Sequence, residues 1–401
     1  MPLTEIVLKP TAVAGSGRVR CFEFSGGKSR ITQITTFCPD VIGPGPVHSY
    51  LIHDQALVMM DAGIPTHLAK AFFYYWRNQP VPQEIDNLLS DHSEREFLEG
   101  IKLAGYSIPD VDLLVISHGH PDHFLMANNI LSRGKAPVSA HILDTPEICN
   151  PWGLLNMWVS LQRQMTAVGM PPPLSPKKFL SLEDLRGFDF DHLGVSLKVD
   201  TPFLRDGPIV AGGMTIEEIQ VKHLPGHTSG SIGLLVGKPE DEKVLLCGDV
   251  LLNPITPHPD DLLVYLQTLE ELSTYDDVVL VLPAHGRAIR NLNNRVAFLK
   301  AHHENRLRVT YQACHVPRCV WDIASMPDYF DTFVDPNQFN FLAGLEALVH
   351  LEVLIMVGGL IRTHIRDEVH YFQNCGLPFE EIYGRIMELV ADKRKRALMR
   401  F

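Results

Sequence analysis

The stretch Ser117-His118-Gly119-His120-Pro121-Asp122-His123 decides the fold of this 401-residue chain. It follows the apolar run 111–116, whose length and composition predict a buried strand. Four side chains that can bind a metal therefore lie at the end of a strand, in a loop that a rigid scaffold can hold open to substrate. Zinc prefers imidazole and carboxylate ligands. A polar loop with three chance histidines is the alternative, but ionisable groups packed this tightly need partners that offset their desolvation.

The pattern His118-x-His120-x-Asp122-His123 resembles the signature of the metallo-β-lactamase superfamily. Four further motifs of that family stand in the expected order: Asp61 in Asp-Ala-Gly, His227 in Pro-Gly-His-Thr, Asp249 in Cys-Gly-Asp, and His285 in Pro-Ala-His-Gly. The five motifs span residues 61 to 285. The resemblance implies an α/β fold, the αββα sandwich, as a catalytic domain over residues 1–300.

The resemblance also implies where two metal ions bind. It assigns His118, His120 and His227 to one ion, Asp122, His123 and His285 to the other, and Asp249 to a bridging position. Two zinc ions are expected, with iron or manganese as alternatives that the same ligand types accept. Asp61 is expected to orient the ligand loop without touching a metal. Asp122 is also the expected catalytic residue, accepting a hydrogen bond from the nucleophile.

A dinuclear site of this kind predicts hydrolysis. Two neighbouring cations move the pKa of a shared water from about 16 toward about 7, so a metal-bridging hydroxide can attack a carbonyl. Resemblance to glyoxalase II-like enzymes predicts an acyl bond of thioester or lactone type and a small-molecule substrate such as an acyl thioester. The alternative is a phosphodiesterase of the ribonuclease Z-like type. A non-catalytic binding module would require that ligands be missing, and none is.

Composition narrows the class of protein. The chain is 45% hydrophobic and 20% charged, as in ordinary soluble proteins, and its net charge of −12 argues against nucleic acid as a partner. Seven cysteines without a C-x-x-C pair favour a reducing compartment. The N-terminus lacks a signal-peptide pattern, and no apolar run reaches the length of about 18 residues that spans a membrane. A cytoplasmic protein that does not contact membranes is expected.

Local patterns predict the elements that carry the motifs. Alternating residues 48–60 predict a hairpin that leads to Asp61, and apolar runs at 216–222, 244–246 and 278–282 predict the strands before the later ligands. Ser93 matches a capping box that opens a helix toward Gly105. Gly226 is expected to let the backbone pass close to the metal. His223 is interpreted as an ordinary strand residue, and Cys247 as a small buried one.

Residues 146–205 form an insertion between the second and third motifs. One apolar stripe at helical spacing runs through it: Leu154, Trp158, Leu161, Met165 and Val168. A lid over the metal cleft, a homodimer contact and a plain core helix all remain open. The aromatic stretch 68–76 is interpreted as core packing, with a pocket wall as the alternative.

Residues 301–401 are predicted to form a winged-helix-like α+β appendage. Helices are expected from Arg306, at 320–324 and at 341–357, followed by a hairpin at 360–372, as in the branch of glyoxalase II-like hydrolases with a C-terminal winged helix. Residues 340–358 contain no Lys or Arg, so the third helix is expected to pack through Leu342, Leu345, Val349 and Leu351 and not to bind phosphates. The basic run 393–396 is interpreted as a solvated helix end, with a phosphate-bearing arm such as coenzyme A as the alternative.

Overall fold

Two facing β-sheets form the centre of the molecule. The computed structural model describes residues 4–11, 15–24, 29–39, 45–77, 81–150, 167–171, 196–238, 240–338 and 340–392. The first sheet has its strands in chain order: β1 (Thr4–Lys9), β2 (Val19–Glu23), β3 (Arg30–Thr36), β4 (Val47–His53), β5 (Leu57–Met60), β6 (Leu113–Val115) and β7 (Val138–Ser139). Strands β1 to β5 are antiparallel, and β5, β6 and β7 are parallel. The predicted hairpin is therefore confirmed as β4 and β5.

The second sheet has the order β12-β11-β10-β9-β8. Its strands are β8 (Gly207–Ala211), β9 (Met214–His223), β10 (Ile232–Val236), β11 (Lys243–Leu246) and β12 (Val278–Leu282). The strands predicted at 216–222, 244–246 and 278–282 are thus confirmed. Apolar side chains of both sheets, among them Ile52 and Met60 of the first and Leu234 and Leu282 of the second, form one core between them. This burial is the main stabilising term that holds the sheets face to face.

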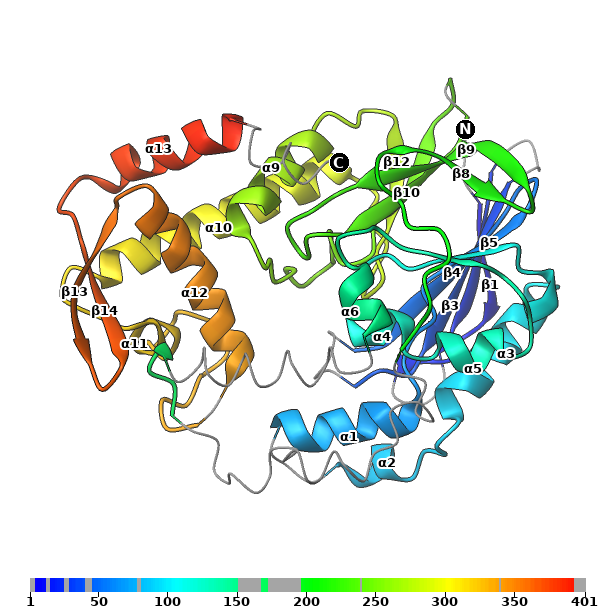
Figure 1. Ribbon diagram of the computed structural model, residues 1–401, viewed down its shortest axis with the longest axis horizontal. Coiled ribbons are helices and arrows are strands. Elements are labelled where there is room, and N and C mark those ends of the chain that lie inside the picture. Colours follow the sequence, from blue (N-terminus) through cyan, green and yellow to red (C-terminus); the bar gives the residue numbers. More distant parts are fainter. Residues whose placement is uncertain are drawn as a thin grey trace.

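Helices cover the outer face of each sheet (Figure 1). The first sheet packs against one set, and the described elements of that side are α1 (Thr66–Arg77), α2 (Gln83–Asp86), α3 (His92–Leu103), the 3-10 turn η2 (Ile108–Asp110), α4 (Pro121–Phe124), α5 (Ala127–Leu131) and α6 (Thr145–Cys149). The second sheet packs against α9 (Leu262–Leu272) and α10 (Leu292–Ala313). The αββα sandwich expected from the sequence is therefore present.

A C-terminal helical and β region lies to one side of the sandwich, and α10 extends from the sandwich to it (Figure 1). Its elements are α11 (Val320–Ala324), α12 (Phe341–Met356), β13 (Leu360–Arg366), β14 (Val369–Asn374) and α13 (Phe379–Ala391). Strands β13 and β14 form a separate two-stranded antiparallel sheet. One apolar core joins this region to α9, α10 and the second sheet. The predicted domain boundary at residue 300 stays a prediction and falls within α10.

Several local predictions were wrong. Ser93 does not cap α3, which begins at His92 after Asp91, because its hydroxyl is buried and exchanges a hydrogen bond with Thr66 Oγ1 at 2.8 Å. The helix expected from Arg306 begins earlier, at Leu292, where Asn291 caps it. Leu342 was expected to pack but is 48% exposed, since it lies in the first turn of α12, whereas Val349 and Leu351 are buried.

Two predictions fall largely outside the described residues. In the insertion, Leu154, Trp158, Leu161 and Met165 lie outside them, and so does the basic run 393–396. At the end of the stripe, Val168 is buried in the core of the C-terminal region and its carbonyl accepts a hydrogen bond from the Trp321 amide at 3.0 Å. That end of the insertion therefore packs on α11.

Within the part of the chain that is described, no helix is both long and apolar enough to cross a membrane. All seven cysteines lie in that part and are free thiols.

Candidate metal centre

Seven histidine and aspartate side chains converge where strands of the two sheets end. His118 and His120 lie in the loop after β6, and Asp122 and His123 lie on α4, which follows that loop. The other three follow the ends of the second sheet's strands: His227 after β9, Asp249 after β11 and His285 after β12. Six of the seven are at most 5% exposed, and His120 is half-buried. The structure thus brings every predicted ligand into one buried cluster.

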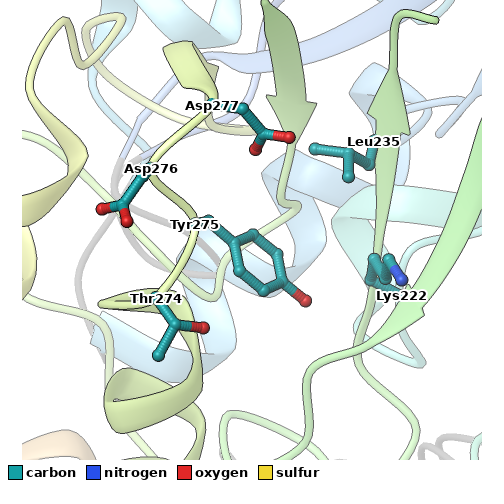
Figure 2. A pocket seen from close by; sticks show the side chains of 6 residues that line it. All are labelled: Lys222, Leu235, Thr274, Tyr275, Asp276 and Asp277. Atoms are coloured by element: carbon teal, nitrogen blue, oxygen red, sulfur yellow. The ribbon is translucent and has the colours of Figure 1, made fainter. Parts of the chain in front are cut away.

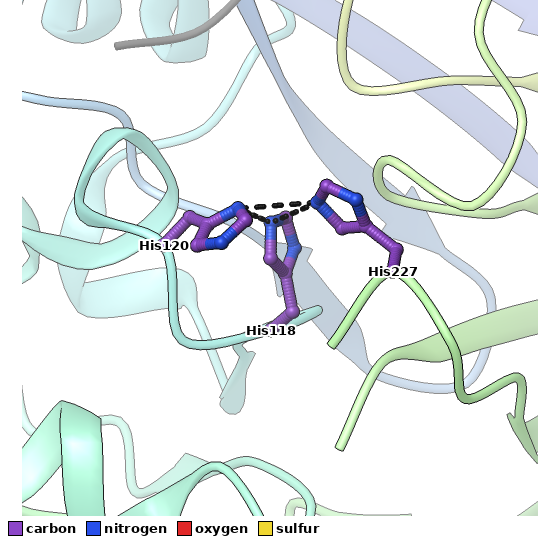
Figure 3. A group of neighbouring side chains, drawn as sticks. All are labelled: His118, His120 and His227. Atoms are coloured by element: carbon purple, nitrogen blue, oxygen red, sulfur yellow. Dashed lines mark hydrogen bonds between the residues drawn. The ribbon is translucent and has the colours of Figure 1, made fainter. Parts of the chain in front are cut away.

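Three imidazole nitrogens form a small triangle (Figure 3). His118 Nε2 lies 3.0 Å from His120 Nδ1, and His227 Nε2 lies 3.2 and 3.1 Å from these two atoms. Zinc–nitrogen bonds of about 2.0–2.1 Å in a tetrahedral site place neighbouring nitrogens about 3.3 Å apart. The triangle is therefore close to the spacing that one metal ion requires.

The second set is built around carboxylates. Asp122 Oδ2 lies 3.2 Å from His285 Nε2, and Asp122 Oδ1 lies 3.7 Å from His123 Nε2. Asp249 faces both sets, because its Oδ1 is 3.8 Å from His285 Nε2 while its Oδ2 is 3.8 Å from His227 Nε2. This is the orientation that a carboxylate shared by two cations requires.

Orphaned polar atoms show that this cluster fits a metal. Four buried atoms have no hydrogen-bond partner among the described residues: Asp122 Oδ2, His123 Nε2, Asp249 Oδ1 and His285 Nε2. Buried polar atoms without partners are costly and rare, and these four belong to side chains that converge on one point. Nitrogen and carboxylate oxygen donors are also those that zinc and similar divalent ions prefer.

The far sides of the imidazole rings fix their tautomers. His227 Nδ1 donates to the His258 carbonyl at 2.7 Å, and His285 Nδ1 lies 3.1 Å from the carbonyls of Gly45 and Pro46. Since a carbonyl oxygen can only accept, each Nδ1 carries a proton and Nε2 is the nitrogen turned toward the cluster. Both rings are therefore oriented so that Nε2, in its unprotonated form, can bind a metal.

Electrostatics differ between the two sets. Burial lowers the pKa of His118 well below its ordinary value and that of His120 to about 3, so these rings are neutral. Burial also opposes charge on His123, but the carboxylates of Asp122, Asp61 and Asp249 outweigh it and raise the pKa of His123 well above its ordinary value. Burial would raise the pKa of Asp249, but His285 and His123 hold it below its ordinary value. The cluster therefore contains ionised carboxylates that can balance the charge of bound cations.

Asp61 braces the ligand loop, as predicted. Its Oδ1 accepts from the Ser117 amide at 2.7 Å, and its Oδ2 accepts from Ser117 Oγ at 2.7 Å and from His123 Nδ1 at 2.8 Å. Its φ of 60° lies in the left-handed region, which Asp and Asn adopt more readily than most residues. Asp61 thus fixes both the start of the loop and the orientation of one ligand ring.

Asp144 is a structural partner of the site that the sequence did not reveal. Its Oδ2 accepts from the Gly119 amide at 2.8 Å and from Thr228 Oγ1 at 2.6 Å, and its Oδ1 accepts from the Gly230 amide at 2.6 Å. Asp144 therefore ties the loop of His118 and His120 to the loop of His227. No motif marks it, because its partners lie 25 and more than 80 residues away in the sequence.

Other expectations have clear outcomes. His223 ends β9 outside the cluster, and its ring stacks on His141 with 3.9 Å between ring centroids. Cys247 is fully buried, and its thiol lies 3.4 Å from the Leu251 carbonyl. At Gly226 a Cβ would lie 2.4 Å from the Cα of Tyr265, so the backbone here also passes close to a helix. Gly226 is required by the close approach of α9, which then positions His227.

A separate pocket lies elsewhere on the molecule (Figure 2). It has a volume of about 460 Å³ and is formed by β9, β10 and the turn after α9, with the lining residues Lys222, Leu235, Thr274, Tyr275, Asp276 and Asp277. None of the seven cluster residues lines it. It is distinct from the candidate metal centre.

Comparison with known proteins defines the class. The profile of the metallo-beta-lactamase superfamily matches residues 42–285, which is more than half of the chain. The chain therefore belongs to the metallo-β-lactamase superfamily. The buried cluster of His118, His120, Asp122, His123, His227, Asp249 and His285 is consistent with the dinuclear metal site of that superfamily.

Individual relatives share the fold. A metallo-beta-lactamase family protein from Thermus thermophilus is 19% identical, with a TM-score of 0.61 and coverage of 86% of this chain and 98% of that one. A beta-lactamase domain protein from Burkholderia ambifaria is 22% identical, with a TM-score of 0.63 and coverage of 91% and 96%. An uncharacterized protein of Mycobacterium leprae (strain TN) is 26% identical over 183 residues, 44% of this chain and 69% of that protein.

Proposed function

We propose that this chain is a dinuclear metal-dependent hydrolase that cleaves an acyl bond of thioester or lactone type. The observation that carries the proposal is the pair of ligand sets joined by Asp249, with four orphaned polar atoms turned toward the same point. His118, His120 and His227 would hold one ion, and Asp122, His123 and His285 the other. Two bound cations would supply the Lewis acidity that activates water near neutral pH and stabilises negative charge on the carbonyl oxygen.

Asp122 is the proposed catalytic residue. His123 and His285 outweigh the effect of burial and lower the pKa of Asp122, so its carboxylate is ionised. An ionised carboxylate can accept a hydrogen bond from the attacking nucleophile and keep it oriented toward the carbonyl carbon. Its Oδ2 lies 3.2 Å from His285 Nε2, which places the carboxylate within the ligand cluster.

The side chains beside the cluster support direct attack by water over a covalent intermediate. Ser117 Oγ donates a hydrogen bond to Asp61 Oδ2 at 2.7 Å. The same Asp61 oxygen also contacts His123 Nδ1. Burial raises the pKa of the Cys247 thiol to about 12, so it is not a thiolate at neutral pH. Neither residue is prepared to act as a nucleophile.

An acyl substrate is favoured over RNA because α12 offers no positive charge for phosphate contacts. Helix α12 contains Glu346 and Glu352 but no Lys or Arg, and the net charge of the chain is −12.

We further propose that the C-terminal elements form a winged-helix-like module with a structural role. Exposed apolar side chains on α12 and β13, including Met356 at 50% and Ile361 at 57%, support a homodimer contact there. Sedimentation of the purified chain tests that contact, and a monomer at micromolar concentration would contradict it.

Elemental analysis and a substrate panel test the proposed activity. The purified chain should contain about two transition-metal ions in this centre, and a chelator should abolish turnover. The panel contains thioesters, lactones, a β-lactam, a phosphodiester and single-stranded RNA, each with and without chelator. Turnover of a thioester or lactone that Asp122→Asn removes is the expected result. RNA cleavage that depends on Asp249, without acyl hydrolysis, would overturn the proposal.

A further inference from the structure

A second group of metal-binding side chains lies between α10 and α12, outside the seven residues described above. His302 and His303 are neighbours on α10, and Glu346 lies on α12. One ligand atom from each lies within 4.8 Å of the other two. His302 Nε2 is 3.9 Å from Glu346 Oε1, beyond the distance of a hydrogen bond. These groups therefore face one another without bonding directly.

A chain of hydrogen bonds fixes the tautomer of His303. His350 Nδ1 lies 2.7 Å from the Glu346 carbonyl, so it carries a proton and donates it there. His350 Nε2 is then an acceptor, and His303 Nδ1, 3.1 Å away, donates to it. With its proton placed on Nδ1, His303 presents a bare lone pair at Nε2.

That lone pair has nothing to bind among the described residues. His303 is fully buried, and its Nε2 has no hydrogen-bond partner there. His302 Nε2 is also buried without a partner, although the His302 side chain as a whole is 22% exposed. Burial lowers the pKa of His303 well below its ordinary value, which keeps the ring neutral. Two unpartnered imidazole nitrogens beside a carboxylate are the pattern that a cation would satisfy.

Glu346 supplies the negative charge. Its Oε2 lies 3.0 Å from His258 Nδ1, which holds the carboxylate, while Oε1 is turned toward His302. Burial would raise the pKa of Glu346, but the hydrogen bond with His258 opposes this effect, and the pKa lies well below its ordinary value. An ionised carboxylate fixed through one oxygen leaves the other free to bind a cation.

We propose that His302, His303 and Glu346 form a further site for a divalent transition-metal ion such as zinc. Two imidazoles and one carboxylate match zinc better than calcium or magnesium, which prefer oxygen ligands. Binding draws the donors from separations of up to 4.8 Å toward about 3.3 Å, and the partly exposed His302 ring is the group with room to move. Water completes the coordination from the exposed side.

This site is connected to the candidate metal centre by two hydrogen bonds. Glu346 Oε2 pairs with His258 Nδ1 at 3.0 Å, and the His258 carbonyl accepts from His227 Nδ1 at 2.7 Å. A cation that fixes Glu346 also fixes His258, and with it the ring of His227. The site therefore fastens the C-terminal region to the loop that carries a proposed ligand.

Zinc content of the full chain tests the site without any substrate. His302→Gln should bind about one zinc equivalent less than the chain carrying His315→Gln, a matched change of an exposed histidine that follows α10. Glu346→Gln keeps the shape of the side chain but removes its charge, and should show the same loss. His350→Leu leaves the three ligands in place but removes the acceptor for His303, and should weaken zinc affinity by about 10–100-fold.

A background with the other centre disabled separates this proposal from the proposed function. The full chain with His118→Ala and Asp249→Ala should still retain about one zinc equivalent, and adding His302→Gln should remove it. Circular dichroism of each variant checks that it is folded. Equal zinc content in folded His302→Gln, Glu346→Gln and His315→Gln would overturn the further site, whatever the hydrolase assays show. Zinc lost with His302→Gln would support it even if no acyl substrate is turned over.

Discussion

Asp249 illustrates how a single carboxylate can serve two ligand sets. Its Oδ1 lies 3.8 Å from His285 Nε2 of one set, and its Oδ2 lies 3.8 Å from His227 Nε2 of the other. Cys247 lies two positions earlier yet points into the apolar core, because the chain turns sharply at Gly248, whose φ is 52°. Asp249 therefore belongs to the proposed metal site, whereas Cys247 belongs to the apolar core.

Replacing Asp249 should be far more damaging than replacing Cys247. Asp249→Ala removes negative charge between two cations, so we expect loss of hydrolysis and reduced metal content, above all at Asp122, His123 and His285. Cys247→Ala should retain metal and cost about 1 kcal/mol of unfolding free energy, the effect of a small cavity. Metal analysis measures the metal content of each variant, and urea unfolding measures its free energy of unfolding. Metal lost with Cys247→Ala but kept with Asp249→Ala would contradict the assignment of this motif.

Asp61→Asn tests the bracing of the ligand loop. Asn tolerates the φ of 60° but replaces one carboxylate oxygen with an NH2 group, which cannot accept a hydrogen bond. The side chain can then no longer accept hydrogen bonds from both Ser117 and His123. We expect metal affinity to fall about 10–100-fold, measured by competition with a chromophoric chelator. Asp328→Asn is the matched control, because exposed Asp328 also has positive φ, at 65°. Equal affinities in the two variants would show that Asp61 does not orient the site.

At the scale of elements, the second sheet and α9 position His227 together. Thr268 Oγ1 of α9 donates to the Pro225 carbonyl at 2.6 Å, and the Gly226 carbonyl accepts from the amide of Asp261, the N-cap of α9. The loop after β9 is thus pressed against the start of a helix. This contact leaves no room for a side chain at Gly226.

Gly226→Ala and Gly213→Ala separate a steric clash from backbone strain. Both glycines have positive φ, 128° and 79°, but a Cβ at Gly226 would meet Tyr265 backbone at 2.4 Å whereas Gly213 has open space. Strain alone costs about 1–3 kcal/mol. We expect Gly213→Ala to lose no more unfolding free energy than this strain and to keep the metal of the candidate centre. Gly226→Ala should lose more unfolding free energy and should also lose metal at His227. Urea unfolding and metal analysis decide, and equal losses would contradict the role of α9.

At the scale of the whole molecule, buried neutral histidines link stability to pH. His141 is 1% exposed and stacks on His223, with an angle of 11° between the rings. Burial, together with the neighbouring His223, lowers the pKa of His141 to about 3, below the ordinary value of 6.5. Between these pH values the unfolded chain binds a proton that the folded chain does not. The contribution of His141 to stability is therefore complete above pH 6.5 and is lost as the pH falls.

His141→Gln should reduce this pH dependence. Below about pH 6.5, the unfolding free energy of the unaltered chain should fall faster than that of the variant by about 1.4 kcal/mol per pH unit. Urea unfolding at pH 7, 6 and 5, with chelator throughout, measures the difference without contributions from bound metal. Parallel pH curves for the two chains would show that His141 is not the buried group responsible.

Several features of this protein were determined by the sequence alone, because they depend on short-range pattern. The hairpin of β4 and β5 and the strands before the ligands follow from alternation and apolar runs, and the order of the motifs follows from the resemblance to a family. Helix starts were less accurate. Ser93 has the residues of a capping box around it, but Thr66, 27 residues earlier, takes its hydroxyl in the packed structure.

Only the tertiary structure decided which distant residues meet. Asp144 joins two ligand loops, and Glu346 reaches His258 across 88 residues of sequence. His302 and His303 lie on a helix whose sequence carries no metal-binding motif, and they gain a carboxylate only because α12 packs against α10. Such contacts are set by how helices and sheets bury their apolar faces, which short-range spacing does not encode. The ligand types could therefore be predicted from the sequence, whereas the groups that brace and connect them are products of packing.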